Sequence, residues 1–251
     1  MDIEKDFKLK DSSDTTNETK AAKETKAANA AKAAKDAKAA KDAKDTKDTL
    51  AAKGGLNKQK IFVQIAAYRD PQLLPTLKDC IANAMFPENL VFSIAWQHSL
   101  DDKWDNLDEY KTDKRFKILD FNASDSKGAC WARNALQQNY GGEEFTLQLD
   151  SHHRFVKHWD HILILMYENL VKKGFPKPLI TGYIPSFDAA NDPQGRVHVP
   201  WKMNFDKFIP EGAVFFLPAA IENFEQLKDP IRARFYSAHF AFTTGLFVKE
   251  V

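Results

Sequence analysis

An acid, two histidines and an arginine follow a short apolar run in FTLQLDSHHRF, residues 145–155. Asp150 and His152 are separated by one residue, so their side chains would point the same way if the chain stayed extended there. A carboxylate oxygen and an imidazole nitrogen on one side can bind a divalent cation, and this pair suits Mn²⁺ or Zn²⁺ better than Ca²⁺. Such an ion could neutralise a diphosphate as a bond to it breaks.

The same residues also have simpler explanations. An isolated Asp-x-His is a weak motif, because Asp150 could be a helix cap or a loop acid bonded to the backbone and His152 a surface imidazole. His153 and Arg154 would add positive charge beside the pair, or they could belong to an ordinary polar loop. These residues alone leave both interpretations open.

Four residues elsewhere in the sequence could contact a nucleotide. Arg69 and Arg133 could bind a diphosphate, because a guanidinium group makes planar, bidentate phosphate contacts. Tyr68 and Trp131 could stack on a base. The alternatives are an exposed helix arginine for Arg133 and core packing for either aromatic ring.

Alternating strands and helices must position these residues from Lys60 onward. Apolar runs predict strands, and longer amphipathic or buried stretches predict helices. The predicted strands are 61–67, 90–97, 116–121 and 145–149, and the predicted helices follow Asp70 and span 128–140 and 159–173. This order predicts an α/β fold with a mainly parallel sheet, in which ligands bind beyond the carboxyl ends of the strands.

Two details of this pattern bear on the site. Asp70 can cap the helix that follows it, with Pro71 at the first helical position. The segment HFAFTTGLFVKEV, residues 239–251, predicts a strand, so we expect His239 to pack within the core and Glu250 to continue that strand.

Residues 1–55 differ in composition from the rest of the chain. They are rich in Ala, Lys and Asp and have almost no large apolar side chains. Without an apolar stripe such a segment cannot dock as a helix, which favours a disordered or fluctuating helical tail. A lysine-rich arm that binds an acidic partner is the alternative.

The overall charge excludes a general attraction to nucleic acid or to a membrane surface. Lys and Arg number 36 against 35 Asp and Glu, which gives a net charge of +1. Only two cysteines occur, and no apolar run approaches the roughly 20 residues that a membrane helix needs. We therefore expect a cytoplasmic protein in a reducing compartment.

Taken together, the motifs YRDP, GACWAR and LQLDSHHRF occur in an order that resembles a known family. Its members are cytoplasmic N-acetylglucosaminyltransferases that modify a hydroxyproline of the S-phase kinase-associated adaptor of a ubiquitin ligase. The resemblance implies a GT-A fold over residues 60–251, with a nucleotide-binding half at about 60–155 and an acceptor-side half at about 156–251. It also implies UDP-GlcNAc as donor, a divalent metal such as Mn²⁺, a protein or peptide acceptor, and transfer with retention.

The resemblance also implies roles for individual residues. Asp150 and His152 would be the metal ligands. The residues that would contact the nucleotide sugar, its diphosphate or the acceptor are Tyr68, Arg69, Asp70, Trp131, Arg133, His153 and Arg154.

Two departures from the family pattern affect this expectation. The family continues beyond the position of Val251 with a Gly-Glu-Glu segment and a later histidine that resembles a third metal ligand. His153 stands where an apolar residue such as methionine is expected. The sequence is therefore compatible with a working UDP-GlcNAc transferase, with an inactive nucleotide-sugar-binding fragment, or with a scaffold that acts through its lysine-rich tail.

Overall fold

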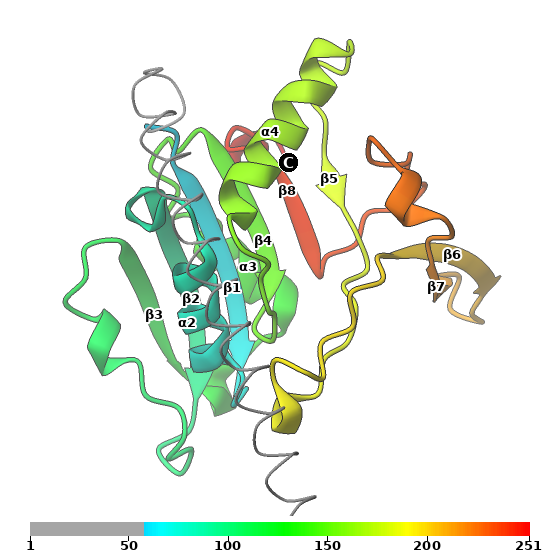
Figure 1. Cartoon of the computed structure of the whole chain (residues 1–251). Coiled ribbons are helices and arrows are strands. Elements are labelled where there is room, and N and C mark those ends of the chain that lie inside the picture. The colour runs from blue at the N-terminus through cyan, green and yellow to red at the C-terminus, as the bar shows by residue number, and fades with distance from the viewer. Residues whose placement is uncertain (1–57) are drawn as a thin grey trace, which may run out of the picture. The chain divides into compact units, whose positions relative to one another are not determined.

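A six-stranded sheet with the order β3-β2-β1-β4-β8-β5 is the centre of the computed structural model, which describes residues 58–251 (Figure 1). The tail predicted for residues 1–55 lies outside the described residues. The parallel strands are β1 (Ile61–Tyr68), β2 (Leu90–His98), β3 (Phe116–Asn122) and β4 (Phe145–Asp150). Strand β8 (Phe240–Thr244) is antiparallel to both β4 and β5 (Ile180–Thr181). The predicted α/β class with a mainly parallel sheet is confirmed.

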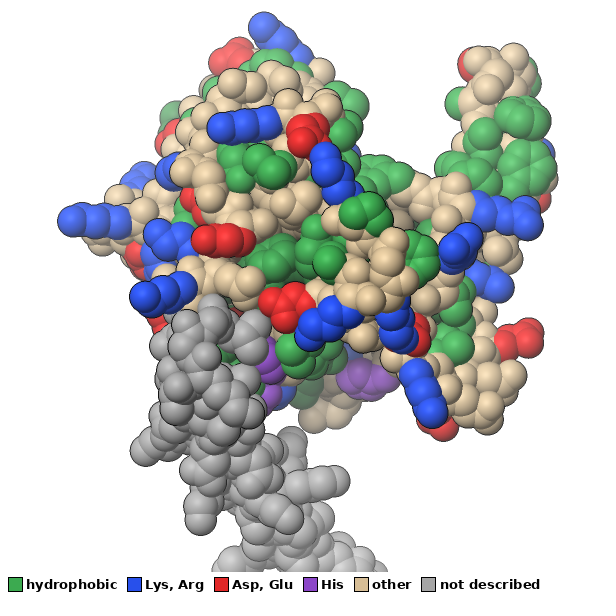
Figure 2. Space-filling model, turned by 90° about the horizontal axis from the view of Figure 1, so that it is seen from above, with side chains coloured by type: hydrophobic (Ala, Val, Ile, Leu, Met, Phe, Trp, Pro, Cys, Tyr) green, Lys and Arg blue, Asp and Glu red, His purple; other side chains and the backbone are tan. Residues whose placement is uncertain are grey.

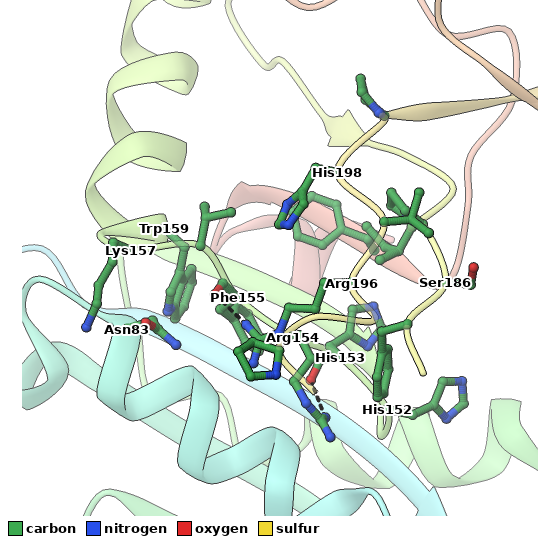
Figure 3. Close-up of a pocket in the computed structure, with 18 of the residues that line it drawn as sticks. Asn83, His152, His153, Arg154, Phe155, Lys157, Trp159, Ser186, Arg196 and His198 are labelled. Carbon is green, nitrogen blue, oxygen red and sulfur yellow. Dashed lines mark hydrogen bonds between the residues drawn. The ribbon is translucent and has the colours of Figure 1, made fainter. Parts of the chain in front are cut away.

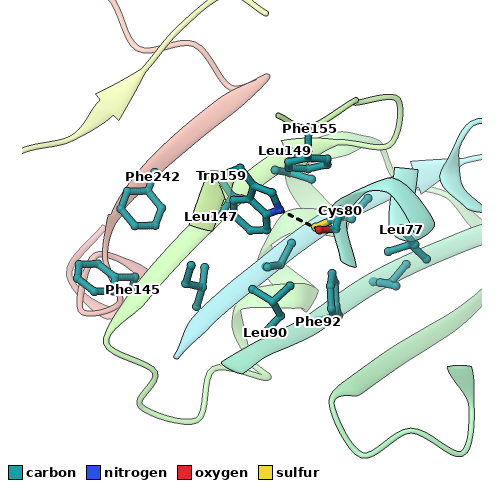
Figure 4. Close-up of a cluster of buried hydrophobic side chains, with 14 of the residues drawn as sticks. Leu77, Cys80, Leu90, Phe92, Phe145, Leu147, Leu149, Phe155, Trp159 and Phe242 are labelled. Carbon is teal, nitrogen blue, oxygen red and sulfur yellow. Dashed lines mark hydrogen bonds between the residues drawn. The ribbon is translucent and has the colours of Figure 1, made fainter. Parts of the chain in front are cut away.

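Helices cover both faces of this sheet (Figure 1). Helices α2 (Leu73–Asn83) and α4 (Trp159–Lys172) pack on one face, and α3 (Ala129–Gln137) packs on the other. The main core lies under α2 and α4, where Trp159 Nε1 also donates a hydrogen bond to the carbonyl oxygen of Cys80 at 2.8 Å (Figure 4). Single 3₁₀ turns span Pro87–Asn89, Asp108–Tyr110, Ala123–Asp125, Ala189–Asn191 and Phe224–Gln226.

The alternation of side chains along β4 decides which way Asp150 faces. Phe145, Leu147 and Leu149 belong to the core under α2 and α4. Because successive side chains of a strand point to opposite faces, Asp150 must face α3. The strand pattern therefore directs this carboxylate away from the large core and towards the helix that carries Arg133.

The C-terminal segment was predicted as one strand, and this prediction is wrong beyond Thr244. Strand β8 ends there, and residues Phe247–Glu250 form the short helix α5. Gly245 makes the turn between them, since its N–H donates to the carbonyl of Glu144 at 2.8 Å and an added Cβ would lie 2.0 Å from the carbonyl oxygen of Glu143. Glu250 therefore leaves the sheet, and its carboxylate pairs with Lys177.

The chain from the end of β5 to just before β8 lies outside the central sheet apart from Thr181, and we call residues 181–236 the outer region. It contains the hairpin of β6 (Trp201–Phe208) and β7 (Val214–Ala220), which pair with each other but not with the central sheet. None of its residues is fully buried.

Two surface properties accompany this architecture. Acidic and basic side chains are mixed over the face that Figure 2 shows, as the near-zero net charge predicts. Within residues 58–251, no helix combines the length and the apolar character needed to cross a bilayer.

Candidate functional site

Several of the predicted site residues, among them Tyr68, Asp70 and Asp150, lie at the carboxyl ends of β1 and β4. These two strands are parallel neighbours, with Ala66 of β1 opposite Asp150 of β4. Tyr68 ends β1, Arg69 and Asp70 follow it, and Arg133 projects from α3 beside them. The site therefore lies at the edge of the sheet where α/β proteins bind ligands.

Asp150 is held by two nitrogen-bearing side chains. Arg133 donates from one terminal nitrogen to Asp150 Oδ1 at 3.0 Å, and the Nδ1 atom of His239 lies 2.6 Å from Oδ2. The same guanidinium nitrogen reaches the carbonyl oxygen of Ala238 at 3.3 Å. An arginine and an imidazole thus converge on one carboxylate at the end of the strand.

His239 was expected inside a strand and in the core, and this prediction is wrong. Strand β8 starts one residue later, at Phe240, and the side chain of His239 is 45% exposed. The backbone N–H of Asp150 bonds to the carbonyl of His239 at 3.3 Å, so the antiparallel pairing brings this histidine to the carboxyl edge of the sheet. Its position next to a strand was visible in the sequence, but the pairing partner of that strand was not.

The chain does not remain extended after Asp150. It bends at Ser151 and His152, because the hydroxyl of Thr76 on α2 bonds to the carbonyl of Ser151 at 2.8 Å and to the N–H of His153 at 2.9 Å. Asp150 and His152 consequently contact different partners in this structure. Asp150 faces α3, whereas His152 Nδ1 lies 2.8 Å from Asp70 Oδ2.

Asp70 connects the ends of the two strands. Its Oδ1 accepts the N–H of Gln72 at 2.8 Å, so it caps the turn that precedes α2, although the regular helix begins at Leu73 and not at the predicted Pro71. Its Oδ2 accepts from the hydroxyl of Ser151 at 2.5 Å and faces His152.

These contacts favour a negative Asp70 and a positive imidazole. Burial acts to raise the pKa of Asp70, but the hydrogen bonds from His152, Ser151 and the N–H of Gln72 outweigh it and lower that pKa to about 2. The bond to Asp70 raises the pKa of His152 in turn.

Asp70, Asp150, His152 and His239 form two hydrogen-bonded acid–imidazole pairs at this edge. Carboxylate oxygens and imidazole nitrogens are the donor atoms that Mn²⁺ and Zn²⁺ accept, so the chemistry of the residues fits a divalent ion. No three His, Cys, Asp or Glu side chains converge on one point within the described part of the chain. The carboxylate oxygens of Asp70 and Asp150 and the Nδ1 atoms of both histidines already take part in hydrogen bonds.

Arg69 forms a salt bridge with Asp102, which lies in the loop after β2. Its Nε and one terminal nitrogen lie 2.9 and 2.7 Å from the two carboxylate oxygens of Asp102, whose side chain is fully buried. The backbone of Arg69 has φ = 47°, a region that a residue with a side chain seldom adopts. The strained backbone and the bidentate pair together fix the turn after Tyr68.

The two candidate aromatic residues differ in exposure. Tyr68 is 56% exposed at the end of β1. Trp131 is half-buried on α3, with its ring 4.8 Å from that of Phe121. Tyr68 therefore has a ring face free for contact with a ligand, and Trp131 also packs against the sheet.

His153 and Arg154 turn away from Asp150 towards α2 and the outer region. His153 is only 5% exposed, and burial lowers its pKa to about 4. Arg154 donates to Asp192 at 2.5 Å and to Gln72 at 2.6 Å, and its guanidinium lies 4.2 Å from the ring centre of Phe187. Its charge is already paired with an acid of the outer region.

Comparison with known proteins gives one family match. A family model described as "Glycosyltransferase (GlcNAc)" matches residues 60–118 and 107–251. These ranges together include all of the elements that position the site. No curated protein sequence matches the chain significantly.

Proposed function

The chain belongs to the GlcNAc glycosyltransferase family, and from this premise we propose that it transfers N-acetylglucosamine from UDP-GlcNAc to a hydroxyl group of a protein or peptide. The observation that carries the proposal is the placement of Arg133 and of two acid–imidazole pairs, Asp150–His239 and Asp70–His152, beyond the carboxyl ends of parallel strands. This is the edge of the sheet at which a nucleotide sugar would place its diphosphate.

Asp150 and His152 are the proposed metal ligands, and Mn²⁺ is the proposed ion. When bound, the ion would neutralise the negative charge on the departing diphosphate. Asp150 Oδ2 and His152 Nδ1 now bond to His239 and Asp70, so an ion that used these two atoms would replace both hydrogen bonds.

The remaining candidates would bind the rest of the donor. Arg133 already lies within hydrogen-bonding distance of Asp150, so its guanidinium could turn from that carboxylate to a phosphate oxygen. Tyr68 and Trp131 would contact the uracil ring through their faces. Arg69 and Asp70 would shape the uridine pocket, because Asp102 fixes one and the turn before α2 fixes the other.

The finer parts of the proposal come from the family resemblance. They are a GT-A fold, retention of the anomeric configuration, a hydroxyproline acceptor and a cytoplasmic location.

Hydrolysis of UDP-GlcNAc in the presence of Mn²⁺ tests the proposal without knowledge of the acceptor. We expect the full chain to release UDP, and Asp150→Asn and His152→Gln to reduce the rate by more than about 100-fold, because each loses a metal ligand. Asp229→Asn is the matched control, since Asp229 is an acid of the outer region paired with Lys173.

Melting temperature separates loss of metal from loss of folding. UDP with Mn²⁺ should raise the melting temperature of the wild type but not that of a folded Asp150→Asn variant. Full hydrolysis by Asp150→Asn would contradict the metal assignment. A rise in melting temperature without hydrolysis would identify an inactive nucleotide-sugar-binding protein, and the absence of both would favour a scaffold.

A further inference from the structure

Two cavities adjoin the outer region, and they differ in how their arginine residues are paired. The first, of about 620 Å³, has Arg154 and Arg196 in its wall (Figure 3). Asp192 forms a salt bridge with each of these arginines, and Asp79 forms another with Arg196. Both arginines of this wall therefore already have acidic partners.

The second cavity, of about 420 Å³, contains basic side chains without such partners, and we call it the basic cavity. Lys202, Arg232 and Arg234 line it. Among residues 58–251, no Asp or Glu belongs to its wall, and none of the three basic side chains forms a salt bridge. Glu222 and Lys202 both line an adjoining cavity, but they too remain unpaired with each other.

This arrangement favours an anionic ligand. Charges of one sign along a concave wall reinforce one another, because the low-dielectric wall focuses their field. Arg232 also lies with its guanidinium carbon 5.5 Å from the ring centre of Phe175, a contact that supports the side chain without neutralising its charge. A carboxylate would supply the missing negative charge, and a guanidinium group binds it through two parallel N–H donors.

Aromatic and aliphatic side chains form much of the remaining wall. Trp201, Met203, Ile231 and Phe235 line it, and the rings of Tyr183 and Trp201 stack with their centres 6.4 Å apart. Such a surface can pack against the methylene groups that carry a carboxylate, whereas a small inorganic ion would leave it uncovered. The wall therefore fits an acidic side chain of a polypeptide better than a free ion.

Tyr183 connects the basic cavity to the proposed site. Its ring packs edge-on against the ring of His239, with the two centres 4.9 Å apart. The Nδ1 atom of His239 in turn lies 2.6 Å from Asp150 Oδ2. Because each residue of an extended chain spans about 3.3 Å, an acid in the cavity and a hydroxyl group near Asp150 could belong to one peptide, within about four residues of each other.

We propose that the basic cavity binds an acidic segment of the protein acceptor and so directs transfer to hydroxyl groups that have Asp or Glu close by in the sequence. The direction of transfer rests on the proposed function, whereas the binding of an acidic segment does not. The net charge of +1 hides this local excess of positive charge, because acids elsewhere in the chain balance it.

Two rhodamine-labelled hexapeptides test the binding step, one with alternating serine and glutamate and the other with alternating serine and glutamine. They have the same length and the same hydroxyl groups, but only the first is acidic. In fluorescence anisotropy titrations at low salt, we expect the full chain to bind the glutamate peptide about tenfold more tightly. Arg232→Gln/Arg234→Gln should reduce this preference to less than about twofold, and it should remain folded because both side chains are exposed.

Lys207→Gln/Lys228→Gln is the matched control. It also removes two positive charges from exposed positions of the outer region, but neither lysine lines the basic cavity. It should therefore keep the preference for the glutamate peptide. A further measurement uses the wild type alone: in ¹⁵N spectra, the side-chain Nε–H signals of Arg232 and Arg234 should shift with the glutamate peptide and not with the glutamine peptide.

Equal affinity for the two peptides, no binding of either, or unchanged arginine signals would overturn the proposal. A preference that persists in the arginine variant would also overturn it, because the binding would then lie elsewhere, for example on the lysine-rich residues 1–55. Displacement of the glutamate peptide by an equal concentration of inorganic phosphate would assign the cavity to a phosphate group instead.

None of these measurements uses UDP-GlcNAc or Mn²⁺. If the cavity assignment fails, the hydrolysis test of the proposed function is unaffected. If the chain does not hydrolyse UDP-GlcNAc, the preference for the glutamate peptide is still expected, so the two failures are distinguishable.

Discussion

The sheet and the outer region are built from similar side chains but are stabilised in different ways. The sheet region, residues 58–180 and 237–251, contains every fully buried residue of the described chain. The outer region is also rich in aromatic residues, yet Phe205, Phe208 and Phe215 are each roughly half-exposed or more. Apolar composition makes a core only where two layers cover each other, and the hairpin has no second layer.

Polar contacts hold the outer region where hydrophobic burial does not. Asp192 pairs with Arg154 and Arg196, and Arg196 also pairs with Asp79 of α2. The N–H of Phe155, in the loop after β4, donates to the same Asp79 at 2.6 Å. One network therefore joins the outer region, α2 and the loop that carries the site.

The largest contrast should appear when the same residue is shortened in each region. Leu147 in β4 is fully buried, and Leu217 in β7 is 48% exposed. We expect Leu147→Ala to lower the free energy of unfolding by about 3 kcal/mol, because it removes buried methyl groups and leaves a cavity. Leu217→Ala should cost less than about 0.5 kcal/mol. Urea denaturation with tryptophan fluorescence measures both values.

Equal losses from the two leucines would break the comparison. They would mean that the outer hairpin is covered by another surface in solution. A smaller loss for Leu147→Ala alone would instead indicate that the core under α2 and α4 relaxes around the missing side chain.

An intermediate effect is expected at the network between the regions. Asp192→Asn keeps the shape of the side chain but removes the charge that pairs with two arginines, so we expect a loss of about 1 kcal/mol. The local effect should be clearer, with faster proteolysis and hydrogen exchange over residues 184–200 than in the sheet. The control Asp229→Asn affects a more exposed pair, so it should change neither proteolysis nor hydrogen exchange over residues 184–200. Unchanged exchange in Asp192→Asn would show that other contacts hold the segment.

The sheet could be predicted from the sequence because its strands have a local signature. Apolar runs at β1, β2 and β4 locate strands that are buried on both faces, and the intervening helices require parallel neighbours. The outer region has no comparable combination of apolar runs and intervening helices. Its strands β6 and β7 pair only with each other, and no local pattern in the sequence reveals that pairing.

The part of the site that lies at the ends of parallel strands could be predicted from the sequence. Asp70 and Asp150 come directly after apolar runs, so their meeting at one edge follows from parallel order. His239 was missed because it reaches that edge through an antiparallel strand from much later in the chain. The bend after Asp150 was missed because Thr76, on a different helix, causes it.

The smallest expected effect is a difference in pH dependence between the sheet region and the outer region. Burial lowers the pKa of His161 on α4, so the unfolded chain binds more protons below about pH 6.5, and stability in the sheet region falls as the pH falls. In the outer region, the salt bridges with Arg196 and Arg154 lower the pKa of Asp192, although burial opposes this effect. The ion pairs of Asp192 should therefore weaken only as the pH falls below about 3.8. The free energy of unfolding of the wild type should therefore fall between pH 7 and pH 5, and His161→Gln should make this fall smaller by less than about 1 kcal/mol. Over the same pH range, hydrogen exchange in residues 184–200 should not change relative to exchange in the sheet. Earlier loss of protection in residues 184–200 would show that the outer region, and not the buried histidine, sets the acid limit of the fold.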